Sequence, residues 1–198
     1  MMRRTITLCA LAVAAAATTL AAPAAAGAST GGAAAMTVPM RVRAGLTLHV
    51  PAAWSVYRRG DWLRVVTGAC AHPERGFFEP NCDSFWVLGP KAIKYGHELF
   101  SPYTPDQPFY PATDVEPCPV SRRLSGVLGK ATAIGLKQVG PGHKANYRSW
   151  PGRCVTSKGE QKDTYTQREW YLPKSKILVV DQHGTPELAG ILKNATWS

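Results

Sequence analysis

The sequence contains few acidic residues and none of the residue spacings that commonly bind metals. Its 198 residues include 13 Asp and Glu against 23 Lys and Arg, which gives a formal net charge of +10. The five His and five Cys residues form no CxxC, HxxxH or HExxH pattern, so we expect no metal site and no cofactor. The predicted domain has no Gly-x-Ser-x-Gly motif, and the scattered histidines and acids select no catalytic triad. The sequence therefore favours binding over catalysis.

The chain also lacks an apolar run long enough to form a transmembrane helix. The strongest run covers residues 6–20, about 15 residues, whereas a spanning helix needs roughly 20. Arg3 and Arg4 precede this run, and the small residues Ala24 and Ala26 follow it. This arrangement is typical of a secretory signal peptide, and its alanine-rich composition is similar to that of leaders from exported bacterial proteins. We therefore predict a secreted, extracellular protein.

The leader divides the chain into three predicted parts. Residues 1–28 form the signal peptide, residues 29–36 a flexible Gly/Ala/Ser/Thr tail, and residues 37–198 a single globular domain. Removal of the leader removes two arginines and no acid, so the formal charge of +10 becomes +8. The mature protein is therefore expected to be basic.

Four cysteines remain after the leader, which contains the fifth. They are Cys70, Cys82, Cys118 and Cys154. An even number of cysteines in an oxidising compartment predicts two disulfides. Three pairings are possible, and we favour Cys70–Cys82 with Cys118–Cys154 because short loops close most readily.

Most of the predicted domain shows the alternation of apolar and polar residues that indicates antiparallel strands. The predicted strand segments are RVRAGLTLHVP, the two halves of WSVYRRGDWLRVV, GKATAIGLKQV, KANYRSW, YTQREWYL and KILVVD. Between them, residues 102–119 contain six prolines and are predicted to form a long loop. The last four segments are expected to form a meander.

A C-terminal helix is predicted after these strands. Thr185 is a good N-cap and Pro186 suits the first helical position. One apolar stripe follows, formed by Leu188, Ile191, Leu192 and Ala195. We therefore predict an α+β fold, in which the helix packs on an antiparallel sheet of about six or seven strands and two disulfides stabilise the domain.

Three segments resemble the ends of PsbP/Mog1-like domains, a fold that includes small secreted bacterial lipoproteins. These segments are GLTLHVPAAWSVYR, REWYLPKSKILVVD and PELAGILKNATW. Members of that family are mostly non-enzymatic binding or assembly modules, so the resemblance implies no catalytic residues. The two predicted disulfides and the proline-rich middle depart from the family pattern.

Phe77 and Phe78 are the candidate binding residues. They lie together in the middle of the predicted Cys70–Cys82 loop, which is too short to have a core of its own. One hypothesis is that the stapled loop presents both rings as a preorganised apolar tip for a partner. The alternative is that the loop folds over the main core and the rings plug it.

The histidines give no comparable signal. The two close pairs, His72 with Glu74 and His97 with Glu98, are interpreted as solvated surface residues. His49 and His183 flank predicted strands and are likewise expected to be exposed.

The basic residues are spread along the chain and form no nucleic-acid-binding motif. Outside the cell, a basic surface favours association with anionic wall polymers or lipid headgroups. We therefore predict a secreted, non-catalytic interaction domain whose partner is a protein or an anionic cell-wall polymer. The alternative is a small secreted hydrolase whose site is assembled from dispersed residues.

Overall fold

The computed structural model describes residues 36–74, 76–96, 102–111 and 116–198. The predicted signal peptide, all of the predicted tail except Met36, and the His97–Glu98 pair lie outside the described residues. Within the described part of the chain, no helix has the length and apolar character needed to cross a bilayer.

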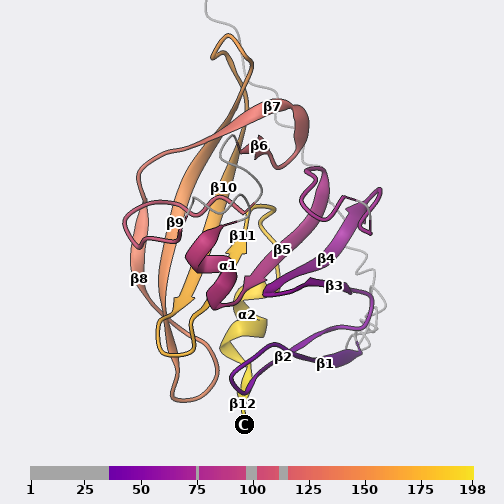
Figure 1. Cartoon of the computed structure of the whole chain (residues 1–198), viewed down its shortest axis with the longest axis vertical. Helices are drawn as coiled ribbons and strands as arrows, with labels where there is room; N and C mark the ends of the chain where they lie inside the picture. The colour runs from indigo at the N-terminus through magenta and orange to yellow at the C-terminus, as the bar shows by residue number, and fades with distance from the viewer. Residues whose placement is uncertain (1–35, 75, 97–101, 112–115) are drawn as a thin grey trace, which may run out of the picture. The chain divides into compact units, whose positions relative to one another are not determined.

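The described residues form two antiparallel sheets (Figure 1). Across the larger sheet the order is β3 (Ser55–Arg59), β4 (Trp62–Cys70), β5 (Cys82–Leu88), β11 (Ile177–Asp181), β10 (Gln161–Leu172), β9 (Lys144–Val155), β7 (Ser121–Leu128) and β6 (Pro117–Cys118). β8 (Ala133–Gln138) also pairs with β9, along residues 144–149, whereas β7 pairs with residues 152–155. The smaller sheet has the order β1 (Thr37–Arg41), β2 (Leu46–Pro51) and β12 (Thr196–Trp197).

The predicted strands are largely confirmed, including the meander of β8 to β11 and the β3–β4 hairpin. That hairpin turns at Gly60, whose φ of 58° favours glycine. The proline-rich segment contributes only the two-residue strand β6, so its described part is mostly loop, as predicted.

The α+β prediction is wrong, because the described domain is mostly antiparallel β-structure. Its two helices, α1 (Pro90–Tyr95) and α2 (Leu188–Lys193), have six residues each. The predicted N-cap, Thr185, does not cap α2, since its hydroxyl donates to Asp181 Oδ1 at 3.1 Å. Residues 185–187 therefore belong to the preceding turn and the helix is short.

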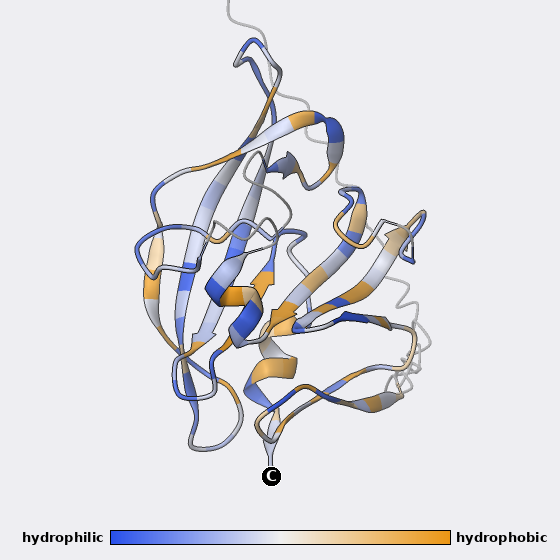
Figure 2. Ribbon diagram, in the orientation of Figure 1, coloured by the Kyte–Doolittle hydropathy of each residue, from blue (hydrophilic) through white to orange (hydrophobic). Residues whose placement is uncertain are grey.

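Apolar side chains cover both faces of the larger sheet. On one face, the smaller sheet and α2 contribute Leu46, Leu48, Val50, Leu188 and Leu192 to a core with Val65, Phe85, Trp170 and Val179. On the other face, Trp86, Leu88, Leu178 and Val180 pack with α1 and with loop residues Phe77 and Phe109. Figure 2 shows the resulting concentration of hydrophobic residues in β4, β5, β11 and α2. We call these the first and second cores.

Both disulfides are present with the favoured pairing. Cys70 bonds Cys82 and Cys118 bonds Cys154. The first joins paired positions of β4 and β5, and the second connects β6 to β9. The stapled loop and the end of the proline-rich segment are thus both fixed to the larger sheet.

Candidate functional site

Phe77 and Phe78 do not project from the stapled loop. Phe77 is 5% exposed and Phe78 is half-buried. The Phe78 ring stacks on Trp86 with centroids 5.4 Å apart, and the Phe77 ring meets Trp86 edge-on at 5.3 Å. Arg59 lies over the Phe77 ring, with its guanidinium carbon 4.8 Å from the centroid. The geometry is that of the plug and not of an exposed tip, and a role for these rings in binding stays a prediction.

Arg64 is the residue that organises the stapled loop, and sequence reasoning missed it. Its side chain is 2% exposed and projects from β4 under the loop. Its acceptors are Ser84 Oγ at 2.9 Å and the carbonyl oxygens of Gly76 at 2.9 Å, Phe77 at 2.8 Å, Glu79 at 2.7 Å and Cys82 at 3.4 Å. All three guanidinium nitrogens donate hydrogen bonds. The buried cation therefore stabilises the loop by satisfying its carbonyl oxygens.

His183 lies in a pocket, contrary to the expectation that it is exposed. The pocket has a volume of about 370 Å³ and is lined in part by Thr67, Asp83, His183 and Glu187. The His183 side chain is only 10% exposed, and its Nδ1 lies 3.7 Å from Asp83 Oδ1. Burial lowers the pKa of His183, although the nearby Asp83 and Asp181 oppose this shift. Burial therefore favours the neutral form of the imidazole.

The turn that carries His183 is fixed by the buried carboxylate of Asp181. Asp181 Oδ1 accepts hydrogen bonds from the His183 N–H at 3.2 Å and from the N–H and hydroxyl of Thr185 at 3.2 and 3.1 Å. Asp181 Oδ2 forms an ion pair with Arg168, whose Nη2 also donates to the Thr185 carbonyl at 2.7 Å. The pocket wall is thus rigid, which a catalytic or a binding site would both require.

The His183 pocket falls short of a catalytic site. The separation of 3.7 Å from Asp83 exceeds hydrogen-bond distance. Among the described residues, no hydroxyl or thiol forms a hydrogen bond with the His183 ring. In the same part of the chain, no three His, Cys, Asp or Glu side chains are placed to hold a metal ion. Nothing in this geometry favours the hydrolase alternative over binding.

A second buried polar group connects the proline-rich segment to the larger sheet. Glu169 Oε1 accepts hydrogen bonds from the Phe109 N–H at 2.8 Å and from Gln167 Nε2 at 2.7 Å. Gln167 Nε2 also donates to the Phe109 carbonyl at 2.7 Å. Gln182 Nε2 then donates to Gln167 Oε1 at 2.7 Å and to Glu116 Oε1 at 2.9 Å. This network positions both ends of residues 109–116 over β10.

Glu169 is expected to make stability fall as the pH rises towards neutrality. Burial raises its pKa from 4.5 to about 7, because the hydrogen bonds to the carboxylate compensate for only part of the desolvation. The folded state thus binds this proton more tightly than the unfolded state between these two values. The unfolding free energy should decrease by about 3 kcal/mol across this window and then level off.

The Glu169→Gln variant should lack this decrease, as measured by urea denaturation at pH 5, 6, 7 and 8. Subtracting the two profiles removes the contribution of His183, whose lowered pKa has the opposite effect on stability. Parallel profiles for the two proteins would contradict the prediction.

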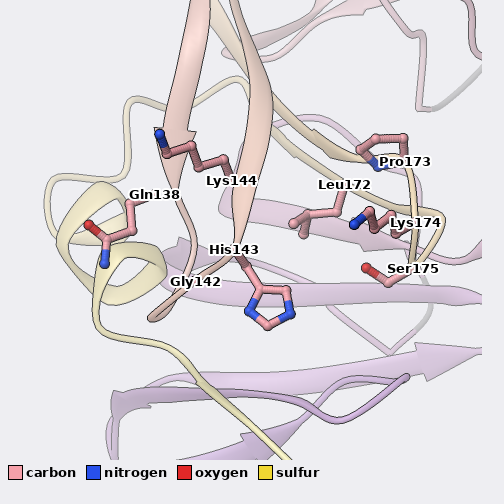
Figure 3. A pocket seen from close by; sticks show the side chains of 8 residues that line it. All are labelled: Gln138, Gly142, His143, Lys144, Leu172, Pro173, Lys174 and Ser175. Atoms are coloured by element: carbon pink, nitrogen blue, oxygen red, sulfur yellow. The ribbon is translucent and has the colours of Figure 1, made fainter.

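The third candidate is a cationic pocket of about 560 Å³ at the end of the larger sheet. Two hairpins line it: Gln138, Gly142, His143 and Lys144 come from the β8–β9 connection, and Leu172, Pro173, Lys174 and Ser175 from the β10–β11 turn. Figure 3 shows Lys174 and Ser175 on one side of the pocket and Gln138 on the other, with His143 between the hairpins. These eight residues include two lysines and no acid.

His143 is oriented within this pocket by two contacts. Its Nδ1 lies 2.9 Å from the Pro141 carbonyl oxygen, and since a carbonyl only accepts, Nδ1 carries the proton. The ring also stacks on Trp197, with centroids 4.1 Å apart, and the Trp197 indole N–H donates to the Val139 carbonyl at 2.8 Å. The loop that bears His143 is therefore supported by β12.

The residues that line the cationic pocket provide several hydrogen-bond donors for an anionic group. Lys144 and Lys174 supply ammonium donors, Ser175 a hydroxyl and Gln138 an amide. Lys144 and Lys174 are 30 residues apart in the sequence, and the pairing of β9 with β10 brings their segments together. We define these four residues with His143 as the cationic pocket.

Searches among protein families, curated proteins and solved structures find no match to this chain. The resemblance to PsbP/Mog1-like domains therefore stays a prediction.

Proposed function

We propose that the protein is a secreted, non-catalytic binding domain that acts at the cell envelope and binds an anionic polymer through the cationic pocket. The observation that carries this proposal is that Lys144 and Lys174 both line one pocket, whose described lining contains no acid. Phosphate or carboxylate groups are the complement of such a set of donors. The overall charge of the mature chain would add attraction at longer range.

Secretion is the second part of the proposal. It is supported by the leader-like composition of residues 1–28 and by the two disulfides, which persist in oxidising compartments. The abundant anionic polymers outside a bacterial cell carry phosphodiester or carboxylate groups. A phosphodiester polymer and a carboxylate polymer are therefore the two probes to compare.

Removal of both pocket lysines should weaken binding of the polymer at least tenfold. The test compares the protein with the Lys144→Ala/Lys174→Ala variant in titrations with inorganic polyphosphate and with polygalacturonate at 0.15 M salt. Both lysines are exposed, so their loss should leave the melting temperature unchanged.

The matched control is the Lys158→Ala/Lys162→Ala variant, which loses the same charge at the opposite end of the β9–β10 hairpin. It should bind within about threefold of the unmodified protein, since these charges lie away from the pocket and act only through screened long-range attraction. Equal weakening in both double variants would assign binding to net charge and overturn the pocket. Absence of binding to either polymer would overturn the proposed function.

A further inference from the structure

Strand β8 has an unusual combination of exposure and apolar character. All six of its residues are exposed, and Ile134 and Leu136 are 71% and 62% exposed. In the described part of the chain, β8 pairs with β9 alone, so its other edge has no strand partner. In Figure 2 a hydrophobic stretch marks this strand at the edge of the sheet.

The usual devices that protect an edge strand are absent from β8 itself. Its six residues contain no proline, and its pairing with β9 has no register shift. Lys137 is its one charged residue, and the ammonium lies 5.3 Å from the centre of the Tyr147 ring. Since side chains alternate between the two faces, Lys137 lies on the opposite face from Ile134 and Leu136. Within β8, no charge therefore lies on the face of the apolar pair, although Arg148 of β9 lies opposite Ile134.

We propose that β8 pairs antiparallel with β8 of a second copy of this chain, about a two-fold axis at Gly135. The sequence AIGLKQ suits this register. Ile134 of one copy lies opposite Leu136 of the other, and this contact occurs twice on the same face. At the axis, Gly135 faces Gly135, and no atom lies within 4 Å of the place where a side chain would begin. The register thus covers both apolar residues at once.

The charges are compatible with this pairing. Lys137 lies opposite Ala133 of the second copy, not opposite its own symmetry mate. The two Lys137 residues are four positions apart along the strands, about 14 Å. This separation exceeds the Debye length of about 8 Å at physiological salt, so their repulsion is largely screened. A shift of one residue would instead place Ile134 opposite Lys137, which favours the register at Gly135.

The sequence of β8 favours a second copy of the same strand, and not an unrelated apolar ligand, as the partner of its free edge. In an antiparallel pair about a two-fold axis, two apolar residues separated by one glycine form a self-complementary pattern. Because a single strand pair is smaller than a standard protein interface, the dimer should dissociate in the micromolar range.

Dimerisation would also affect the proposed binding of the polymer. This consequence, unlike the dimer itself, rests on the proposed function. Gln138 ends β8 on the same face as Ile134 and Leu136, and it pairs with Lys144 of the cationic pocket. The two copies of Gln138 are six positions apart along the paired strands, about 20 Å. Both pockets would then open on one face, where a single polymer could occupy them together.

Sedimentation equilibrium without polymer tests the dimer separately from the proposed function. Between 1 and 500 µM the protein should show a monomer–dimer equilibrium, which the Ile134→Lys/Leu136→Lys variant should weaken at least tenfold. The matched control is Val56→Lys, which adds a charge at an exposed apolar residue of β3, the strand at the opposite edge of the larger sheet. A monomer at 500 µM, or equal association of all three proteins, would overturn the proposal.

Oxidative cross-linking tests the register. Opposite residues in an antiparallel pair have Cα atoms about 4.5 to 5.5 Å apart, which a disulfide can bridge. The Gly135→Cys variant should therefore form a covalent dimer, whereas Lys137→Cys, whose mates are about 14 Å apart, should not. Efficient cross-linking through Lys137→Cys and none through Gly135→Cys would overturn the proposed two-fold axis.

Discussion

Replacement of Arg64 by alanine is expected to lower the free energy of unfolding by about 4 kcal/mol, within the range for broken buried networks of charges and hydrogen bonds. The change removes the guanidinium donors to the carbonyl oxygens of Gly76, Phe77 and Glu79, of which the Gly76 oxygen keeps one hydrogen bond, from the Glu79 N–H at 3.0 Å. It also removes the guanidinium that lies 4.9 Å from the Trp86 ring centre in the second core. Urea denaturation at pH 7 measures the loss.

A companion variant separates hydrogen bonding from packing at this position. Arg64→Met retains the aliphatic stem but no donor, so a loss similar to that of the alanine variant is expected. The matched control is Arg123→Ala, an exposed arginine of β7, which should leave stability within experimental error. A decrease in the free energy of unfolding of less than 1 kcal/mol for both Arg64 variants would show that the stapled loop does not depend on the hydrogen bonds from Arg64.

The Asp181→Ala variant is expected to lose about 3 to 5 kcal/mol of stability, the range for removal of one partner of a buried ion pair. The side chain is not exposed, and its two oxygens accept hydrogen bonds from Arg168, His183 and Thr185. Without the carboxylate, Arg168 loses its ion pair and the turn before α2 loses its central acceptor. Thermal and urea denaturation should both detect the change.

Two further variants sharpen this prediction. Asp181→Asn keeps an acceptor oxygen but no charge, so its loss of stability should be smaller than that of the alanine variant. Asp106→Ala removes an exposed carboxylate from the proline-rich segment and should have no measurable effect. If Asp181→Ala were as stable as this control, the ion pair with Arg168 would not support the turn.

The local pattern of the sequence was sufficient to predict those strands that have one polar and one apolar face. β2 is such a strand, because Leu46, Leu48 and Val50 are buried and His49 is exposed. β5, in which six of seven residues are buried and no alternation remains, was missed. Its partner β11 is buried at every residue and was predicted as a strand, but it follows β5 about 90 residues later, and no short-range pattern encodes their pairing. Alternation therefore identified strands without identifying the centre of the sheet.

The candidate sites were harder to predict because they, too, depend on contacts between residues that are far apart in the sequence. Arg64 lies within an apolar strand and resembles any surface arginine until β5 and the stapled loop cover it. The α+β prediction failed because strands make up most of the described domain and its two helices have only six residues each, with Thr185 bound to Asp181 in the turn before α2. The cationic pocket depends on the register that aligns Lys144 with the β10–β11 turn. The disulfide pairing was predictable because it depends on loop length, which is a property of the sequence itself.

The order of strands in the larger sheet also determines when the chain can fold. β3, β4 and β5 connect to the last third of the domain through the pairing of β5 with β11. During synthesis, the second core cannot form until Leu178 and Val180 have left the ribosome, since both pack in it with Trp86. Contacts of such long sequence separation also make folding slow. The second core and the centre of the larger sheet should therefore form only after β11 has been synthesised.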